Sequence, residues 1–337
     1  YTARELEKLQ SGTPADPEAY VRQTIVDELS QPPEDLFQNF SPSPMASASI
    51  GQVHGATLKD GTRVVVKIQH QGIEEKIRGD LDILDALAAI AERHSAEMRL
   101  YQPQALMAEF RRTLLREVDF KREQMNLQRF DRNFERDPGI HFPRVYPELS
   151  TSKVLTMERL DGFSLADEEQ LESSGLDSKR IAERGATAYL DMIFRDAFYH
   201  ADPHPGNLLI LQGGVIGFLD CGMVGRLDDE TRRQFESLLM SAMDKDGARL
   251  ARTLMQLGTT PRDLDERAFT AEVSEFADDF LSVDLTDFDM AATVEAGTDL
   301  IRRYRIVLRP SISLLIKALL LLEGTSRLVD RSFSIAE

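Results

Sequence analysis

Hydrophobic and polar positions alternate differently in the two halves of this chain. In the first half, short apolar runs bounded by turn residues predict strands: one run ends at Leu58, a second spans residues 63–69, and two more occupy 141–146 and 153–158. From Asp228 onward, apolar residues recur every three or four positions, which predicts helices to the end of the chain. The pattern therefore predicts an α+β protein whose C-terminal part is mainly helical.

Three helices are also expected before the middle of the chain. Residues 16–29 form the first, with Asp16 as N-cap and Pro17 at the first helical position. A charged helical stretch follows over residues 72–99, and residues 110–127 fit one continuous amphipathic helix. The 72–99 segment could cover a pocket, present a partner surface or only widen its lobe.

Two further helices are predicted in the second half. Ser178 is expected to cap a helix that runs to about Tyr199 and leads directly into His200. Pro310 is expected to restart a helix whose apolar stretch is interrupted by Lys317. At about eleven residues, that stretch is too short to span a bilayer and is interpreted as a buried core helix.

A hairpin is predicted between residues 208 and 219. Two apolar runs, 208–211 and 215–219, are joined by Gln212-Gly213-Gly214, which is typical of a tight turn. Since a hairpin of this length folds back on itself, Asn207 and Asp220 are expected to emerge side by side.

The polar residues around this hairpin suit phosphoryl transfer. Asp202 and Asn207 lie in the segment His-Ala-Asp-Pro-His-Pro-Gly-Asn, and Asp220-Cys221-Gly222 follows thirteen residues after the Asn. This is the protein-kinase spacing, in which the first Asp lies near the attacking hydroxyl, and the Asn and second Asp hold Mg²⁺ on the nucleotide phosphates. Alternatively, Asp, Pro, Gly and Asn only serve a turn-rich backbone.

The two histidines of this segment have several interpretations. His200 is expected to brace the loop as a structural residue, whereas His204 could contact phosphate or substrate or only hold the loop. A zinc site is disfavoured, because no further His or Cys with ligand spacing follows and Asn207 suits a hard cation.

A phosphate-binding loop and a phosphate-binding lysine are predicted upstream of this segment. Residues 44–53 follow the template G-x-G-x-x-G-x-V, except that alanines replace the first two glycines; the expected nucleotide-contacting residues are Ala46, Ser47, Ala48, Ser49, Gly51 and Val53. Lys67 follows three valines in a strand that should be buried, where an ammonium group needs a carboxylate partner. Glu117 and Glu123, both on the expected helix 110–127, are available. The strand ending at Glu158 would lead into a hinge, Glu158 to Leu160, whose backbone faces an adenine edge.

These residues, in this order, resemble the UbiB/AarF (ADCK-type) family of atypical kinase-like proteins over nearly the whole chain. The resemblance rests on the alanine-rich loop and the Glu-x-Asp motif. It implies that Glu123 pairs with Lys67 and that Glu117 and Asp119 are the acidic pair peculiar to the family. It also implies that Asp202 is the catalytic-loop aspartate, that Asn207 and Asp220 bind Mg²⁺, and that the cofactor is ATP.

The resemblance further implies a two-lobe protein-kinase-like fold. Residues 1–43 would be a truncated N-terminal helical extension, residues 44–158 the β-rich N-lobe with a helical insertion at about 72–100, and residues 159–337 the mainly helical C-lobe. Family members carry a Lys-x-Gly-Gln motif on that extension; Lys8-Leu9-Gln10 lacks it, and we expect the chain to start just after it. Cys221 stands where most kinases have Phe, and a small buried thiol is expected there.

The composition and one missing motif limit the functions that this chain can have. The net charge of −17 argues against nucleic-acid binding, and the single Cys suits a reducing, cytoplasmic setting. No A-P-E motif follows Asp220, so the peptide-binding platform of protein kinases is expected to be absent. This favours a small-molecule or lipid acceptor, or ATP hydrolysis alone. By resemblance, the setting is isoprenoid-quinone or lipid metabolism, with an isoprenoid or phospholipid ligand and peripheral membrane association outside this chain.

Two other functions are consistent with the same residues. An aminoglycoside- or choline-type phosphotransferase shares the His-x-Asp-x₄-Asn loop but would not explain the alanine loop or the Glu117/Asp119 pair. A noncatalytic ATP-gated scaffold, or a lipid-extraction module, would use the same nucleotide-binding residues.

Overall fold

The computed structural model describes residues 14–94, 103–280, 289–331, 333 and 334. The chain divides into two compact units. The N-terminal unit contains the residues up to Arg136, Phe142–Asp161 and the short segment Asp220–Gly222. The C-terminal unit contains Asp137–His141, Gly162–Leu219 and the residues from Met223 onward.

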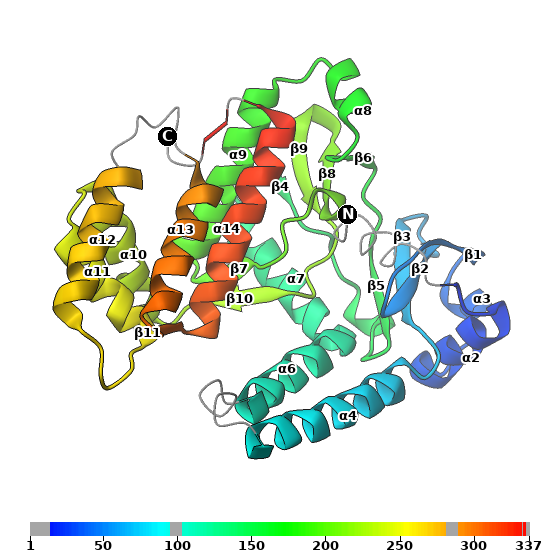
Figure 1. The fold of residues 1–337 in the computed structure, drawn as a ribbon. Helices are drawn as coiled ribbons and strands as arrows, with labels where there is room; N and C mark the ends of the chain where they lie inside the picture. Colours follow the sequence, from blue (N-terminus) through cyan, green and yellow to red (C-terminus); the bar gives the residue numbers. More distant parts are fainter. Residues whose placement is uncertain (1–13, 95–102, 281–288, 332, 335–337) are drawn as a thin grey trace. The chain divides into compact units, whose positions relative to one another are not determined.

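The N-terminal unit is built on an antiparallel sheet in the order β1-β2-β3-β5 (Figure 1). Its strands are β1 (Asn39–Ser47), β2 (Gly51–Thr57), β3 (Arg63–Gln69) and β5 (Val154–Glu158). Val64, Val66 and Ile68 of β3 are fully buried in the core against Val21 and Ile25 of α2. Because side chains alternate along a strand, Lys67 projects from the opposite face of β3.

In the described part of the chain, two short helices precede the sheet, α2 (Glu18–Leu29) and α3 (Pro33–Leu36). Helix α2 confirms the helix predicted at 16–29, but its N-cap residue is Pro17 rather than Asp16. The Asp16 carboxylate instead lies 2.6 Å from the His70 ring, and this contact across 54 residues takes the place of the local helix cap. Strand β1 begins at Asn39, inside the segment assigned from the sequence to the N-terminal extension.

The described helices that follow β3 are α4 (Ile73–His94), α6 (Pro103–Val118) and α7 (Phe120–Phe134). Helices α4 and α6 run side by side as an antiparallel pair (Figure 1). The prediction of one helix over 110–127 is wrong, because the chain breaks at Asp119. The Asp119 carboxylate accepts a hydrogen bond from the Lys121 N–H (3.1 Å) and so caps α7, a position that Asp favours over a helix interior.

The strand predicted at 141–146 is largely absent. Strand β4 comprises only Ile140–His141, and Val145 forms an isolated bridge with Met157. Pro143 lies between them and has no N–H to donate, which prevents a continuous ladder. A 3₁₀ turn, Pro147–Leu149, then leads to β5.

The C-terminal unit contains a second sheet in the order β4-β9-β8-β6. Strands β8 (Leu208–Leu211) and β9 (Val215–Phe218) form the predicted hairpin. Its turn uses positive φ angles at Gly213 (78°) and Gly214 (74°), which glycine adopts without strain. Strand β6 (Gly162–Ser164) pairs with β8, and β4 pairs in parallel with β9.

The helix predicted from Ser178 to about Tyr199 is shorter than expected. Helix α9 (Ser178–Leu190), capped by Asp177, passes into a π-helical turn at Asp191–Arg195. Ala197 then takes a positive φ of 49°, which ends the helical path. Strand β7 (Phe198–His200) follows and pairs with β10 (Val224–Arg226).

Helices make up most of the rest: α8 (Glu168–Ser173), α10 (Asp229–Met243), α11 (Gly247–Leu257), α12 (Glu266–Phe280), α13 (Met290–Arg303) and α14 (Pro310–Val329). The predicted helix start at Asp228 is confirmed, since Asp228 caps α10. Two short strands, β11 (Gly258–Thr259) and β12 (Val307–Leu308), interrupt the expected all-helical pattern.

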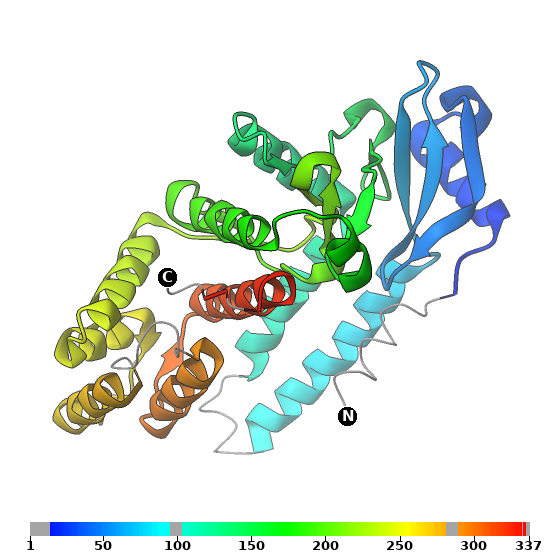
Figure 2. The same ribbon diagram turned by 90° about the horizontal axis from the view of Figure 1, so that it is seen from above.

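Helix α14 lies beside α9 in both views (Figures 1 and 2). It begins at Pro310, as predicted, and spans 20 residues, because the helix continues beyond the apolar stretch through polar positions to Val329. Among the described residues, no helix combines the length and the apolar character needed to cross a bilayer.

Candidate active site

Lys67 is held by two carboxylates within the N-terminal unit. Its Nζ lies 2.8 Å from Glu123 Oε2 on α7 and 3.4 Å from Asp220 Oδ2. The Phe120 ring, at the start of α7, lies 5.1 Å from the same Nζ, measured to the ring centroid. Of the two carboxylates available from the sequence, Glu123 is therefore the one that contacts Lys67.

Burial dominates the electrostatics of this cluster. Glu123 is only 3% exposed, and desolvation raises its pKa to about 7; the charge of Asp220 adds to this rise, and Lys67 opposes it. Desolvation alone would lower the pKa of Lys67, but the negative charges of Asp220 and Glu123 outweigh it and raise that pKa. Lys67 therefore keeps its positive charge at neutral pH, as a phosphate-binding group requires.

The segment Asp220–Gly222 is fixed by contacts inside the N-terminal unit. Asn126 of α7 donates from Nδ2 to the Cys221 carbonyl (2.9 Å), and the Gly222 N–H donates to Asp220 Oδ1 (2.8 Å). The Cys221 thiol is fully buried, and burial raises its pKa well above the usual value. Cys221 is thus the small buried thiol expected from the sequence, and it is not suited to nucleophilic chemistry.

The loop from His200 to Asn207 lies in the C-terminal unit and closes on itself by hydrogen bonds. The Asp202 carbonyl accepts from the His204 N–H (2.8 Å) and from Asn207 Nδ2 (3.3 Å), and the Asn207 N–H donates to the His204 carbonyl (2.8 Å). His200, 1% exposed, accepts from the Asp202 N–H at its Nδ1 (3.2 Å). His200 therefore braces the loop, as the structural interpretation predicted.

Asn207 is held by hydrogen bonds from both its side chain and its backbone. Its side-chain nitrogen donates to the Asp202 carbonyl (3.3 Å). The Asn207 carbonyl also accepts from the Leu219 N–H (2.9 Å), and Asp220 is the next residue in the chain.

The alanine-rich loop is a tight connection between β1 and β2. Ala46 pairs with Val53 and Ser47 with Gln52, and the Ala48 N–H donates to the Gly51 carbonyl (2.9 Å). Ala48 and Ser49 are exposed at the tip.

Gly51 is buried at the base of this loop. A Cβ there would lie 2.4 Å from the Ile68 carbonyl oxygen of β3. Only glycine fits this close approach of two strands, which explains the single glycine of the motif.

A buried polar contact that sequence reasoning missed supports this loop. The His70 ring joins the Asp16 carboxylate (Nδ1 to Oδ2, 2.6 Å) to the Ala48 carbonyl (Nε2 to O, 2.9 Å). The Asp16 N–H also donates to the side chain of Gln52 (3.1 Å). No local pattern signals these contacts, because Asp16 and His70 are 54 residues apart.

The predicted hinge already uses two of its amide groups. The Glu158 N–H donates to the Arg144 carbonyl (2.8 Å), and the Arg159 N–H donates to the Arg63 carbonyl (3.2 Å). The Glu158 carboxylate accepts in return from the Arg144 N–H (3.1 Å). Leu160 thus lies at the end of a segment that is held firmly to β3 and to the strand connection before it.

The family acidic pair lies where α6 meets α7. Glu117 is in the last turn of α6, and Asp119 is the N-cap of α7, with its carboxylate 3.9 Å from Arg122 Nε. The acidic motif therefore marks a helix junction in the N-terminal unit, a few residues before Glu123.

Comparison with known proteins agrees with this arrangement. The ABC1 atypical kinase-like domain matches residues 8–254, and the UbiB helical domain matches residues 273–334. This chain belongs to the UbiB family of atypical kinase-like proteins. The family and the two-lobe kinase-like fold expected from the sequence are both confirmed.

Relatives of this UbiB-family chain include a probable protein kinase UbiB from Pseudomonas paraeruginosa, 34% identical over 96% of this chain and 62% of the relative. Another from Shewanella piezotolerans is 33% identical over 96% of this chain and 60% of the relative. The chain thus spans about six tenths of these relatives. Rv3197 from Mycobacterium tuberculosis, whose structure was solved with erythromycin, has a similar fold with a TM-score of 0.68. The two sequences are 21% identical, and the superposition covers 94% of this chain and 80% of Rv3197.

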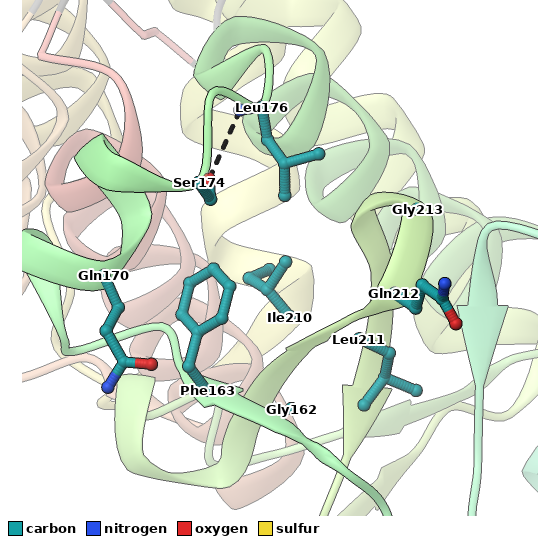
Figure 3. Close-up of a pocket in the computed structure, with 9 residues that line it drawn as sticks. All are labelled: Gly162, Phe163, Gln170, Ser174, Leu176, Ile210, Leu211, Gln212 and Gly213. Atoms are coloured by element: carbon teal, nitrogen blue, oxygen red, sulfur yellow. Dashed lines mark hydrogen bonds between the residues drawn. The ribbon is translucent and has the colours of Figure 1, made fainter.

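A cavity of about 330 Å³ lies in the C-terminal unit, beside the β8–β9 hairpin (Figure 3). It is uncharged; its lining residues are Gly162, Phe163, Gln170, Ser174, Leu176, Ile210, Leu211, Gln212 and Gly213. The Ser174 hydroxyl accepts from the Leu176 N–H (3.2 Å), the dashed line in Figure 3. None of the residues predicted to bind nucleotide or metal lines this cavity.

Proposed function

We propose that this protein binds Mg-ATP and either hydrolyses it or transfers its phosphoryl group to a nonprotein acceptor, in isoprenoid-quinone or other lipid metabolism. The observation that supports this most directly is the buried Lys67–Glu123 ion pair, with the Asp220 carboxylate 3.4 Å from the same ammonium group. Lys67 and Glu123 are both largely buried, which is costly for charged side chains, and a fold retains such a pair where its charges have a task.

Each residue has an assigned role in this proposal. Lys67 holds the nucleotide phosphates, and Glu123 fixes the direction of Lys67. The carboxylate of Asp220 and the amide oxygen of Asn207 are hard oxygen donors of the kind that Mg²⁺ prefers, so these two residues would hold the ion. When bound, the ion neutralises phosphate charge. The Asp202 carboxylate orients the acceptor hydroxyl or a water.

The alanine loop approaches the phosphates with its backbone. No residue from Ala46 to Val53 has a positive φ, and an alanine resists the left-handed conformations that glycine allows. The Ala48 amide already donates to the Gly51 carbonyl, so this loop presents a different set of donors from a glycine-rich loop. At the hinge, where Glu158 and Arg159 are already bonded, we assign the backbone of Leu160 to the adenine edge.

A nonprotein acceptor is favoured by the short connection after Asp220. Strand β10 begins at Val224 and helix α10 at Asp229, so the chain returns to packed secondary structure within a few residues. Protein kinases place a long segment here that supports the peptide substrate. A lipid or another small molecule, or water alone, is the acceptor that this region suits.

The metal assignment is tested with Asp220→Ala. We expect the variant to lose at least about tenfold in Mg²⁺-dependent nucleotide affinity, measured by isothermal titration calorimetry with and without Mg²⁺. Asp80→Ala, which removes an exposed carboxylate of α4, is the matched control. Affinity that is unchanged in Asp220→Ala would exclude Asp220 as a ligand.

A noncatalytic scaffold would use the same binding residues, so turnover decides between the two functions. ATP hydrolysis is measured with the purified chain alone, with a water-soluble isoprenoid analogue and with phospholipid vesicles. Stimulated turnover supports the enzyme. Stoichiometric nucleotide binding without turnover in all three conditions supports the scaffold.

A further inference from the structure

We propose that Thr325 of α14 is a positioning residue for the catalytic loop, an inference that rests on the proposed phosphoryl-transfer function. Its hydroxyl donates a hydrogen bond to the Pro203 carbonyl at 2.8 Å, across 122 residues of sequence and inside the C-terminal unit. Thr325 is 4% exposed, so this bond is shielded from competing water.

The Pro203 carbonyl is one of several points at which the loop is held by residues outside it; the Ala201 N–H also donates to the Met223 carbonyl (3.0 Å), and the Leu219 N–H donates to the Asn207 carbonyl (2.9 Å). The neighbouring carbonyls of Asp202 and His204 accept hydrogen bonds from within the loop itself. Those bonds fix the shape of the loop. The bond from Thr325 holds the loop to α14 at the residue directly after Asp202.

The proline makes this contact effective. The pyrrolidine ring fixes φ at Pro203, so ψ is the remaining soft backbone dihedral of that residue, and ψ sets the direction of its carbonyl. A hydrogen bond that fixes this carbonyl therefore fixes the path from Asp202 to His204. Pro205 restricts the next turn in the same way.

Helix α14 is a firm base for the hydroxyl. Thr325 shares a face with Leu322, three residues before it, and Val329, four residues after it, and both are buried. An apolar residue would suit this face better, since a buried hydroxyl without a partner costs about 1 to 3 kcal/mol. Here the partner is the catalytic-loop carbonyl. The helical region of this family thus contributes to the geometry of the reaction centre.

The expected consequence is a change in turnover rather than in nucleotide affinity. Loss of the hydroxyl frees the peptide next to Asp202 and so relaxes the aim of its carboxylate at the acceptor. Lys67 and Glu123 belong to the other unit and keep their ion pair. We therefore expect kcat to fall and the KM for Mg-ATP to stay within about twofold of the wild-type value.

The test compares Thr325→Val, which keeps the shape but removes the hydroxyl, with Thr325→Ser, which keeps the hydroxyl. We expect Thr325→Val to lose at least about tenfold in kcat and Thr325→Ser to retain most of it. Thr253→Val is the matched control, because that buried hydroxyl donates to the Arg249 carbonyl of its own helix (3.0 Å) and lies 3.5 Å from the Ser237 hydroxyl of α10, so neither partner belongs to the loop. If Thr325→Val does not fold, Thr325→Ala removes the same hydroxyl and carries the same expectation.

Hydrogen exchange provides a readout independent of turnover. We expect amides in the peptide covering residues 203–208 to exchange faster in Thr325→Val than in Thr325→Ser. Equal kcat in the wild type and Thr325→Val, or equal losses in the Val and Ser variants, would overturn the inference while leaving the proposed function intact. A wild type that binds nucleotide but never turns it over would overturn both.

Discussion

Replacing Glu123 by Gln should change how the stability of this protein depends on pH. Burial raises the pKa of Glu123 from its ordinary value of 4.5 to about 7, a difference of about 2.5. At about 1.4 kcal/mol per pKa unit, this corresponds to about 3 kcal/mol of unfolding free energy. Gln is neutral at every pH and has nearly the same shape, so Glu123→Gln removes this titration together with the charged partner of Lys67.

The sign follows from proton uptake. Between pH 4.5 and 7, the folded protein holds a proton on Glu123 that the unfolded chain has already released. The stability from this proton is fully present below pH 4.5 and is lost as the pH rises through 7. The unfolding free energy of the wild type, minus that of Glu123→Gln, should therefore fall by about 3 kcal/mol between pH 4.5 and 8.

The assay is urea unfolding followed by far-ultraviolet circular dichroism, since the chain has no Trp to report by fluorescence. Buffers without divalent metal keep Asp220 in the state described here. Taking the difference between the two proteins cancels other titrations, such as that of Asp228, whose pKa is lowered by the hydrogen bond from the Thr231 N–H. Glu75→Gln, on the exposed side of α4, controls for the loss of one surface carboxylate.

Two outcomes would refute the reasoning. A free-energy difference that stays constant within about 0.5 kcal/mol from pH 4.5 to 8 would mean that burial does not perturb Glu123. A difference that increases with pH would mean that the attraction of Lys67 outweighs desolvation and lowers the pKa of Glu123.

Three further outcomes are expected. Lys67→Met should weaken nucleotide binding by at least about tenfold in calorimetry, because it removes the phosphate-binding charge and leaves two carboxylates unopposed. Asp202→Asn should lower kcat by about 100-fold or more in a steady-state ATPase assay, with unchanged nucleotide affinity. Gly51→Ala should destabilise the protein by about 1 to 3 kcal/mol in urea unfolding, since its Cβ would meet a β3 carbonyl, whereas Gly79→Ala, where nothing lies within 4 Å, should not.

The parts of the fold that sequence reasoning predicted well are those determined by local pattern. The hairpin at 208–219 could be predicted because two apolar runs flank a Gln-Gly-Gly turn. Strand β3 could be predicted from its valines, and the ammonium group of Lys67 beside them needed a carboxylate partner. The choice of Glu123 over Glu117, however, came from family resemblance, because both positions fit an amphipathic helix equally well.

The failures have physical causes that can be named. Asp119 interrupts the helix predicted over 110–127, and an Asp inside a helical pattern is itself the signal of a cap that was overlooked. The end of α9 could not be predicted, because the strand pairing of Phe198 with Arg226 overrides local helix preference. The bond from Thr325 to Pro203 spans 122 residues and leaves no trace in any periodicity.

The three-residue segment Asp220–Gly222 has a consequence for dissecting this protein into fragments. It belongs to the N-terminal unit, although the residues on both sides of it belong to the other unit. A fragment that ends at Asp161 would therefore lack one carboxylate beside Lys67. It would also leave the buried amide of Asn126 without the Cys221 carbonyl. The half of the molecule that carries the alanine loop can be studied faithfully only within a chain that continues past Gly222.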